Sequence, residues 1–210
     1  MDKSQIAASI FNKHAGLYQT KFMDVSLYGE SFDFFCDSIK KQNAEILELA
    51  CGPGNITKYL LSKRPDLKIL GTDLAPNMIE LARQNNPSAE FQLLDCREII
   101  SLEKTYDAIM CGFCLPYLSK EETIKLVEDA SNILNTGGVI YISTMEDDYS
   151  KSGLRKGSQG DEIFMHYYLE SDLTSPLIKN GFKINYIDRV ISEMTDGSAV
   201  TDLILIAEKI

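Results

Sequence analysis

Positive charge is scarce in this chain and is nowhere concentrated. The 210 residues include 21 lysines and arginines against 31 aspartates and glutamates, which gives a formal net charge of −10. A protein with this charge repels phosphate backbones and anionic lipid surfaces. We therefore expect neither nucleic acid nor a membrane among its partners.

Long apolar runs are also missing. No stretch approaches the roughly 20 apolar residues that span a bilayer, and Met1 is followed by Asp2 and Lys3 rather than by the apolar core of a signal peptide. The five cysteines are odd in number and lie mostly in apolar surroundings, which suits reduced thiols rather than a disulfide framework. These absences predict a cytoplasmic protein, and the length suits one domain.

From residue 45 onward the chain repeats one pattern: a short apolar run, a turn rich in Gly, Asp or Pro, and a stretch with helical spacing. This order predicts βαβ units, and the near-continuous apolar runs indicate a parallel sheet that is covered on both faces. The predicted strands are residues 45–49, 68–72, 89–94, 106–110 and 139–144, and the predicted helices are residues 56–63, 76–85 and 120–134.

The two ends of the chain depart from this pattern. Two helical stretches are expected in the first 44 residues, and the polar segment 146–160 is expected to be a long loop. A further helix then ends at Gly181, and Thr195-Asp196-Gly197 between two apolar runs predicts an antiparallel hairpin. These terminal elements are expected at residues 5–11, 31–40, 169–179, 182–190 and 199–209.

The most informative segment is an apolar strand that runs into the turn Ala50-Cys51-Gly52-Pro53-Gly54. Glycine lets a backbone come into contact with a ligand, and ligands of open α/β sheets lie outside the carboxyl ends of the strands. Three carboxylates stand near successive strand ends. Asp73 can accept hydrogen bonds from both hydroxyls of a ribose, Asp95 from an exocyclic amine, and Glu48 can balance an ammonium group. The pattern predicts a nucleotide-like cofactor.

The segments Glu48-Leu-Ala-Cys-Gly-Pro-Gly54, Gly71-Thr-Asp73-Leu-Ala-Pro-Asn-Met78 and Leu94-Asp95 resemble the motifs of class I S-adenosylmethionine-dependent methyltransferases of the small-molecule type. The resemblance covers residues 44–145. Two positions depart from it, because Ala75 replaces a helix-capping serine and Asn135-Thr136 replaces a Lys-Pro-type dipeptide. The family implies an α/β, Rossmann-like, doubly wound seven-stranded sheet of order 3-2-1-4-5-7-6 with strand 7 antiparallel.

The resemblance also implies that residues 1–210 form one domain whose segments have different roles. Residues 1–44 would form an N-terminal helical lid, 45–145 the cofactor-binding core, 146–168 a substrate loop and 169–210 a C-terminal helix and hairpin. The implied cofactor is S-adenosyl-L-methionine, the product is S-adenosyl-L-homocysteine, and no metal is expected. The implied cofactor-binding residues are Tyr18, Glu48, Ala50, Gly52, Gly54, Asp73, Leu74, Met78, Asp95, Cys96 and Cys111.

Methyl transfer from a sulfonium ion is an in-line displacement that needs positioning more than acid–base chemistry. If the acceptor must lose a proton, His14 and His166 are weak candidates for the base. Cys111-Gly-Phe-Cys114 is interpreted as two buried thiols rather than a redox pair or half a metal site. Weak candidates for acceptor binding are Phe113, Tyr117, Asp147, Tyr149, Phe164 and Tyr167.

Two other functions fit part of the pattern. An NAD-dependent oxidoreductase would use the same sheet and the same Asp73, but its fingerprint needs a third glycine where Thr57 stands. A catalytically silent cofactor-binding subunit would keep the fold without turnover. The sequence leaves the identity of the acceptor and the oligomeric state open.

Overall fold

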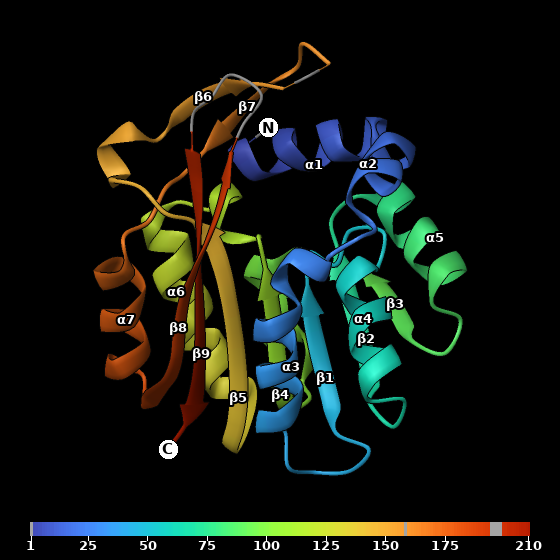
Figure 1. Cartoon of the computed structure of the whole chain (residues 1–210), viewed down its shortest axis with the longest axis vertical. Coiled ribbons are helices and arrows are strands. Elements are labelled where there is room, and N and C mark those ends of the chain that lie inside the picture. The colour runs from blue at the N-terminus through green and yellow to red at the C-terminus, as the bar shows by residue number, and fades with distance from the viewer. Residues whose placement is uncertain (1, 158, 194–198) are drawn as a thin grey trace.

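The computed structural model describes residues 2–157, 159–193 and 199–210, and it shows one large twisted sheet with helices on both faces (Figure 1). The strand order is β3-β2-β1-β4-β5-β9-β8. β9 runs antiparallel to both of its neighbours. The predicted order 3-2-1-4-5-7-6 with an antiparallel seventh strand is therefore confirmed, with β8 and β9 as strands six and seven.

The elements lie close to where the sequence predicted them. The strands are β1 (Glu45–Leu49), β2 (Lys68–Asp73), β3 (Glu90–Leu93), β4 (Tyr106–Gly112), β5 (Leu134–Met145), β8 (Phe182–Glu193) and β9 (Ala199–Lys209). The α-helices are α1 (Lys3–Lys13), α2 (Ala15–Phe22), α3 (Gly29–Ser38), α4 (Asn55–Lys63), α5 (Pro76–Asn85), α6 (Lys120–Ile133) and α7 (Glu170–Lys179). Short 3₁₀ helices are η1 (Ser26–Tyr28), η2 (Cys96–Leu102), η3 (Leu115–Tyr117) and η4 (Tyr149–Lys151).

The central strands are buried on both faces because their side chains alternate between two apolar cores. Leu47 of β1 and Ile109 of β4 pack in the core that contains residues of α6 and α7. Their neighbours Ile46 and Met110 pack in the core that contains residues of α3 and α4. This alternation is the two-residue period of a strand, and it explains why these strands read as continuous apolar runs.

Two predictions about the ends of the chain need correction. Segment 146–160 is not a plain loop, because β6 (Gly153–Lys156) pairs antiparallel with β7 (Glu162–Met165) in a separate two-stranded sheet. β6 is mostly exposed and β7 is mostly half-buried, and both strands are too short to carry the long apolar run that a sequence pattern could reveal. α2 was also not predicted, since its eight residues bury little apolar surface.

The hairpin turn Thr195-Asp196-Gly197 lies outside the described residues. β8 and β9 nevertheless pair antiparallel up to Glu193 opposite Ala199. The roof of the molecule is made by α1 and α2, which lie across the end of the sheet beside β6 and β7 (Figure 1). No helix in the described part of the chain has the length and apolar character to cross a membrane.

Candidate functional site

A cavity lies at the carboxyl ends of β1, β2, β3 and β4 and is roofed by α1 and α2. Its wall therefore combines the turns that follow four neighbouring parallel strands with one face of the N-terminal helices. The lining residues are Ser4, Ala7, Ala8, Phe11, Tyr18, Ala50, Gly52, Asp73, Leu74, Met78, Leu94, Asp95, Cys96, Gly112, Phe113, Cys114, Tyr117 and Leu118.

The turn after β1 presents its backbone to the cavity. Ala50, Gly52 and Gly54 all have left-handed φ angles, of 50°, 53° and 76°. A Cβ on Gly52 would face the Tyr18 ring at 3.8 Å, whereas a Cβ on Gly54 would lie 2.3 Å from the side-chain nitrogen of Asn86. Gly52 therefore lines the cavity, while Gly54 is needed for close packing of the turn against α5.

Asp73 is held in place at the end of β2 by backbone groups. Its carboxylate accepts hydrogen bonds from the Gly52 N–H at 2.9 Å and from the Ala75 N–H at 2.8 Å. The second bond supports the start of α5, where Ala75 supplies no capping side chain. Burial raises the pKa of Asp73, against the lowering effect of these backbone donors. The carboxylate oxygens keep further lone pairs for a ligand at a fixed place.

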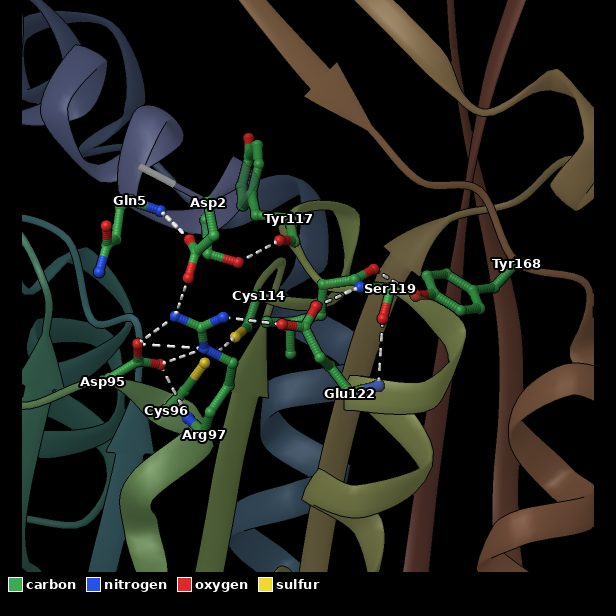
Figure 2. Close-up of polar contacts among 12 residues, drawn as sticks. Asp2, Gln5, Asp95, Cys96, Arg97, Cys114, Tyr117, Ser119, Glu122 and Tyr168 are labelled. Carbon is green, nitrogen blue, oxygen red and sulfur yellow. Dashed lines mark hydrogen bonds and ion pairs between the residues drawn. The ribbon is translucent and has the colours of Figure 1, made fainter.

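Asp95 lines the cavity at the end of β3, where Arg97 holds it (Figure 2). The closest contact joins Arg97 Nη2 and Asp95 Oδ2 at 2.6 Å. The same guanidinium binds Glu122 at 2.7 Å and Asp2 at 3.0 Å. Sequence reasoning missed Arg97, because nothing in its local spacing shows that three carboxylates from separate elements meet around it.

Glu48 lies behind the cavity wall rather than in it. Its side chain is 1% exposed, and its Oε2 accepts a hydrogen bond from the Thr57 hydroxyl at 2.5 Å. Its Oε1 is buried without a hydrogen-bond partner among the described residues. Burial raises the pKa of Glu48 to about 7. An unpaired buried carboxylate oxygen is costly, and a donor that reached it would remove that cost.

The N-terminal helices close the cavity with aromatic rings. Phe11 of α1 packs edge-on against Tyr18 of α2, with ring centroids 5.7 Å apart, and against Tyr117, with centroids 5.1 Å apart. Burial, and secondarily the nearby Asp73 charge, raises the pKa of Tyr18 to about 12. Tyr18 therefore stays protonated and can donate a hydrogen bond into the cavity.

The structure divides the predicted cofactor residues into two groups. Glu48, Gly54 and Cys111 are packed behind the wall, and Cys111 is 1% exposed. The others line the cavity: Tyr18, Ala50, Gly52, Asp73, Leu74, Met78, Asp95 and Cys96. Lining residues that sequence reasoning did not assign are Ser4, Ala7, Ala8, Phe11, Leu94, Gly112, Cys114 and Leu118. Most of these are small or apolar, so their residue types carry no signal of a ligand.

The predicted acceptor residues are also split. Phe113 and Tyr117 line the cavity, whereas the remaining candidates do not. Those outside the cavity make local contacts around β6 and β7: Asp147 pairs with Lys151, Tyr149 with His166, Phe164 with Lys3, and Tyr167 with Arg155.

Neither histidine lines the cavity. His14 Nε2 lies 2.6 Å from Asp161 Oδ2, in a contact that joins the N-terminal helices to the β6–β7 segment. His166 is 4% exposed, and its Nδ1 lies 3.1 Å from the Tyr149 hydroxyl. Burial lowers the pKa of His166. Both contacts lie outside the cavity, and among the described residues its wall contains no histidine or lysine.

Comparisons with known proteins agree with this geometry. Residues 46–138 match a family model described as a methyltransferase domain. A malonyl-[acyl-carrier protein] O-methyltransferase from Acetivibrio thermocellus is 35% identical over 112 residues, which cover 51% of this chain and 38% of the relative. A tRNA (carboxymethyluridine(34)-5-O)-methyltransferase from Saccharomyces cerevisiae is 28% identical over 137 residues, covering 64% of this chain and 47% of the relative.

Among solved structures, magnesium protoporphyrin IX methyltransferase from Synechocystis PCC 6803, with bound SAM, aligns with a TM-score of 0.75 at 15% identity. The alignment covers 100% of this chain and 98% of that one, and it shows a shared fold. The chain spans less than half the length of the first curated relatives it matches. The family model shows that residues 46–138 are similar to a methyltransferase domain, and the sheet order and the solved structures show that the chain shares the fold of S-adenosylmethionine-dependent methyltransferases.

Proposed function

We propose that the protein binds S-adenosylmethionine in this cavity and transfers its methyl group to a small-molecule acceptor by in-line displacement. The observation that carries the proposal is the meeting of the Gly52 turn with the carboxylates of Asp73 and Asp95 in one cavity. That meeting occurs within the segment that matches the methyltransferase domain model.

The lining residues fit the parts of this cofactor. Asp73 would accept hydrogen bonds from the ribose hydroxyls, and Asp95 from the adenine amine. Apolar Leu74 and Met78 lie in the same wall and would contact the adenine ring. Gly52 leaves room for the methionine portion beside Tyr18. The bound cofactor would supply a methyl group that is already activated. The protein would then orient the acceptor toward this methyl group and exclude water from the cavity.

Glu48 fits a supporting role. Its unpaired Oε1 marks a buried place that lacks a hydrogen-bond donor among the described residues. The ammonium of the methionine portion is the donor with suitable charge. A charged partner there would favour the ionised carboxylate and lower the pKa of Glu48 from its raised value.

The charge of the wall favours this cofactor over NAD. Its ionisable acidic groups are Asp73 and Asp95, and no lysine or arginine is among the lining residues. A diphosphate would meet carboxylates without a cation, whereas a sulfonium and an ammonium would be attracted. The same charge, with a net value of −10 over the chain, favours a neutral or cationic small acceptor over a polynucleotide.

The end of β4 is the proposed place of the acceptor. Phe113 has a left-handed φ of 55°, and its N–H is held by Ser143 through the backbone carbonyl at 3.2 Å and the hydroxyl at 3.1 Å. With Tyr117 it forms an aromatic wall that would exclude water from the reacting atoms. Because the lining carboxylates of Asp73 and Asp95 are assigned to the cofactor and no histidine or lysine is in the wall among the described residues, a nucleophile that needs little deprotonation suits the site best.

Calorimetric titration of the purified protein with S-adenosylhomocysteine and separately with NAD tests the cofactor. We expect binding of the former only. Asp73→Ala should abolish it, while Asp33→Ala, which removes the same charge from the α3–α4 surface, should not. Equal binding by both variants would contradict the assignment.

Incubation with methyl-labelled S-adenosylmethionine and panels of small amines, phenols, carboxylic acids and transfer RNA then tests turnover. Label transfer to a small molecule supports the proposal. Transfer to RNA alone would overturn the small-molecule acceptor, and cofactor binding without transfer to any class would favour a silent binding subunit.

A further inference from the structure

Two cysteines lie in contact at the cavity wall. Cys96 follows Asp95 at the start of η2, and Cys114 follows Phe113 just before η3. The Cys114 thiol donates a hydrogen bond to the Cys96 sulfur, and the two sulfur atoms are 3.3 Å apart (Figure 2). Both residues line the cavity. They are separated by 18 positions in the sequence, so only the fold brings them together.

The more obvious sequence pair is Cys111 and Cys114, whose C-x-x-C spacing was interpreted as structural. Cys111 lies in β4, is 1% exposed and does not line the cavity. Small molecules that enter the cavity therefore meet Cys96 and Cys114 first. In the structure, the cysteine pair that lines the cavity is therefore Cys96 and Cys114, and not the C-x-x-C pair.

We propose that Cys96 and Cys114 form a reversible disulfide in the cavity wall, and that this disulfide weakens cofactor binding while bound cofactor slows disulfide formation. The second part rests on the proposed function. The oxidant would be a peroxide and the reductant a dithiol.

The chemistry balances with these two reagents. One thiol attacks a peroxide oxygen, which gives a sulfenic acid and, with hydrogen peroxide, one water. The second thiol attacks the sulfenic sulfur, forms the S–S bond and releases a second water. Two thiols lose two protons and two electrons, and one peroxide becomes two waters. A dithiol reverses the step by thiol–disulfide exchange.

Opposition to the cofactor follows from where the two cysteines sit. One is next to Asp95, which would accept from the adenine amine, and the other is next to Phe113 in the aromatic wall. A disulfide needs its sulfur atoms at about 2.0 Å, so closing the 3.3 Å gap pulls these two walls together. A cofactor that fills the cavity would in turn cover both thiols.

The rate should depend on pH. The contact with Cys114, followed by burial, raises the pKa of Cys96. The contact with Cys111 raises the pKa of Cys114, and burial adds to this. Since the thiolate is the nucleophile, oxidation should be slow at neutral pH and should accelerate as pH rises.

The disulfide itself is tested by treating the whole protein with hydrogen peroxide and mapping its peptides without reduction. We expect loss of two hydrogen atoms, a cross-link between the peptides that contain Cys96 and Cys114, and full reversal by dithiothreitol. Cys96→Ser and Cys114→Ser should abolish the cross-link, whereas Cys111→Ala should keep it. A link between Cys111 and Cys114, or sulfinic acids without any cross-link, would overturn the proposal.

The coupling is tested with S-adenosylhomocysteine. We expect the ligand to slow cross-linking, and the oxidised protein to bind it at least about tenfold more weakly until it is reduced. The control is Cys96→Ser compared with itself: whatever its own affinity for the ligand, peroxide treatment should not change that affinity. Unchanged rate and affinity would overturn the coupling. If the reduced protein does not bind the ligand at all, the proposed function and the coupling fail together, while the peptide map still decides the disulfide.

Discussion

The floor of the cavity, formed by the turns after β1 and β2, and its roof, formed by α1 and α2, are held in place by different interactions. The floor is held by backbone: Asp73 accepts from two main-chain N–H groups, and the turn that contains Gly52 is closed by one of them. The roof is held by side chains, because Phe11 and Tyr18 pack in a small apolar cluster with Ala15, Ala75 and Met78 and polar contacts join the roof to its neighbours. Lys13 pairs with Asp161, Asp2 pairs with Arg97, and Asn77 donates hydrogen bonds to Asn12 from its backbone N–H and from its side-chain amide.

This difference predicts separate effects on the affinity for the cofactor and on the rate at which the cofactor enters and leaves the cavity. Backbone-held groups keep their geometry whether or not a ligand is present, so the floor is preorganised. Exposed ion pairs contribute little to stability, so the polar contacts of the roof can break at low cost. We therefore expect substitutions in the floor to change how tightly the cofactor binds and substitutions in the roof to change mainly how fast it exchanges.

Asp73→Ala should give the largest effect on the floor. It removes the acceptor for two ribose hydroxyls, and charged hydrogen bonds contribute about 1.5–3 kcal/mol each, so the affinity for S-adenosylhomocysteine should fall by at least about 150-fold. Calorimetry measures the loss, and thermal unfolding checks that the variant is folded. A folded variant with near-normal affinity would show that the floor does not hold the ribose.

Glu48→Gln should remove a pH dependence of stability. Burial raises the pKa of Glu48 from 4.5 to about 7, so between these pH values the folded state holds a proton that the unfolded chain has lost. The free energy of unfolding should therefore fall by about 3 kcal/mol as pH rises through this window and stay low above it. Urea unfolding of both proteins at about pH 5 and about pH 8 isolates this contribution.

Glu45→Gln is the matched control for that measurement. Glu45 is partly exposed and pairs with Lys104, which lowers its pKa. Its contribution is therefore present at higher pH and is lost on acidification, which is the opposite sign. If Glu48→Gln follows the wild-type pH curve, the carboxylate is not buried as described.

Tyr18→Phe tests how much a side chain of the roof contributes to cofactor affinity. The hydroxyl stays protonated because the pKa of Tyr18 is raised to about 12, and the ring packs on Phe11 and Phe22. Loss of one hydrogen bond to the cofactor should weaken binding about fivefold. Calorimetry at neutral pH measures it. A drop as large as that of Asp73→Ala would place Tyr18 in the preorganised floor.

Asp161→Asn should have the smallest effect and should act on rate. It removes the carboxylate that pairs with Lys13, which is largely exposed, and with His14, which is partly buried. Affinity should change by less than about threefold, while stopped-flow dissociation of S-adenosylhomocysteine should become faster. Asp172→Asn, which breaks an ion pair between α6 and α7, is the control and should leave the dissociation rate unchanged.

The sequence was most informative where function needs particular backbone chemistry. The Gly52 turn and the position of Asp73 at a strand end are visible in the residue order, because left-handed turns and strand ends restrict which residues occur. The sheet order followed from the family resemblance and is confirmed. The roof was harder to foresee, since Ala7 and Ala8 look like any helical residues and become cavity wall only through tertiary packing.

Contacts between distant segments were beyond the reach of local patterns. Arg97 meets carboxylates from the N-cap of α1 and from α6, and Cys114 contacts Cys96 as well as its sequence neighbour Cys111. The strands of the β6–β7 sheet have only four residues each, which is too short to show a clear apolar alternation. In each case the deciding information is the distance between elements, which follows from the assembled sheet.

Phe113 has a further consequence for how this site could change. It holds a left-handed backbone angle without being glycine, a conformation that costs a bulky residue about 1–2 kcal/mol. A glycine there would relax the chain and also remove an aromatic ring from the cavity wall. Replacing this one residue by glycine would therefore relieve the backbone strain and enlarge the proposed acceptor space at the same time.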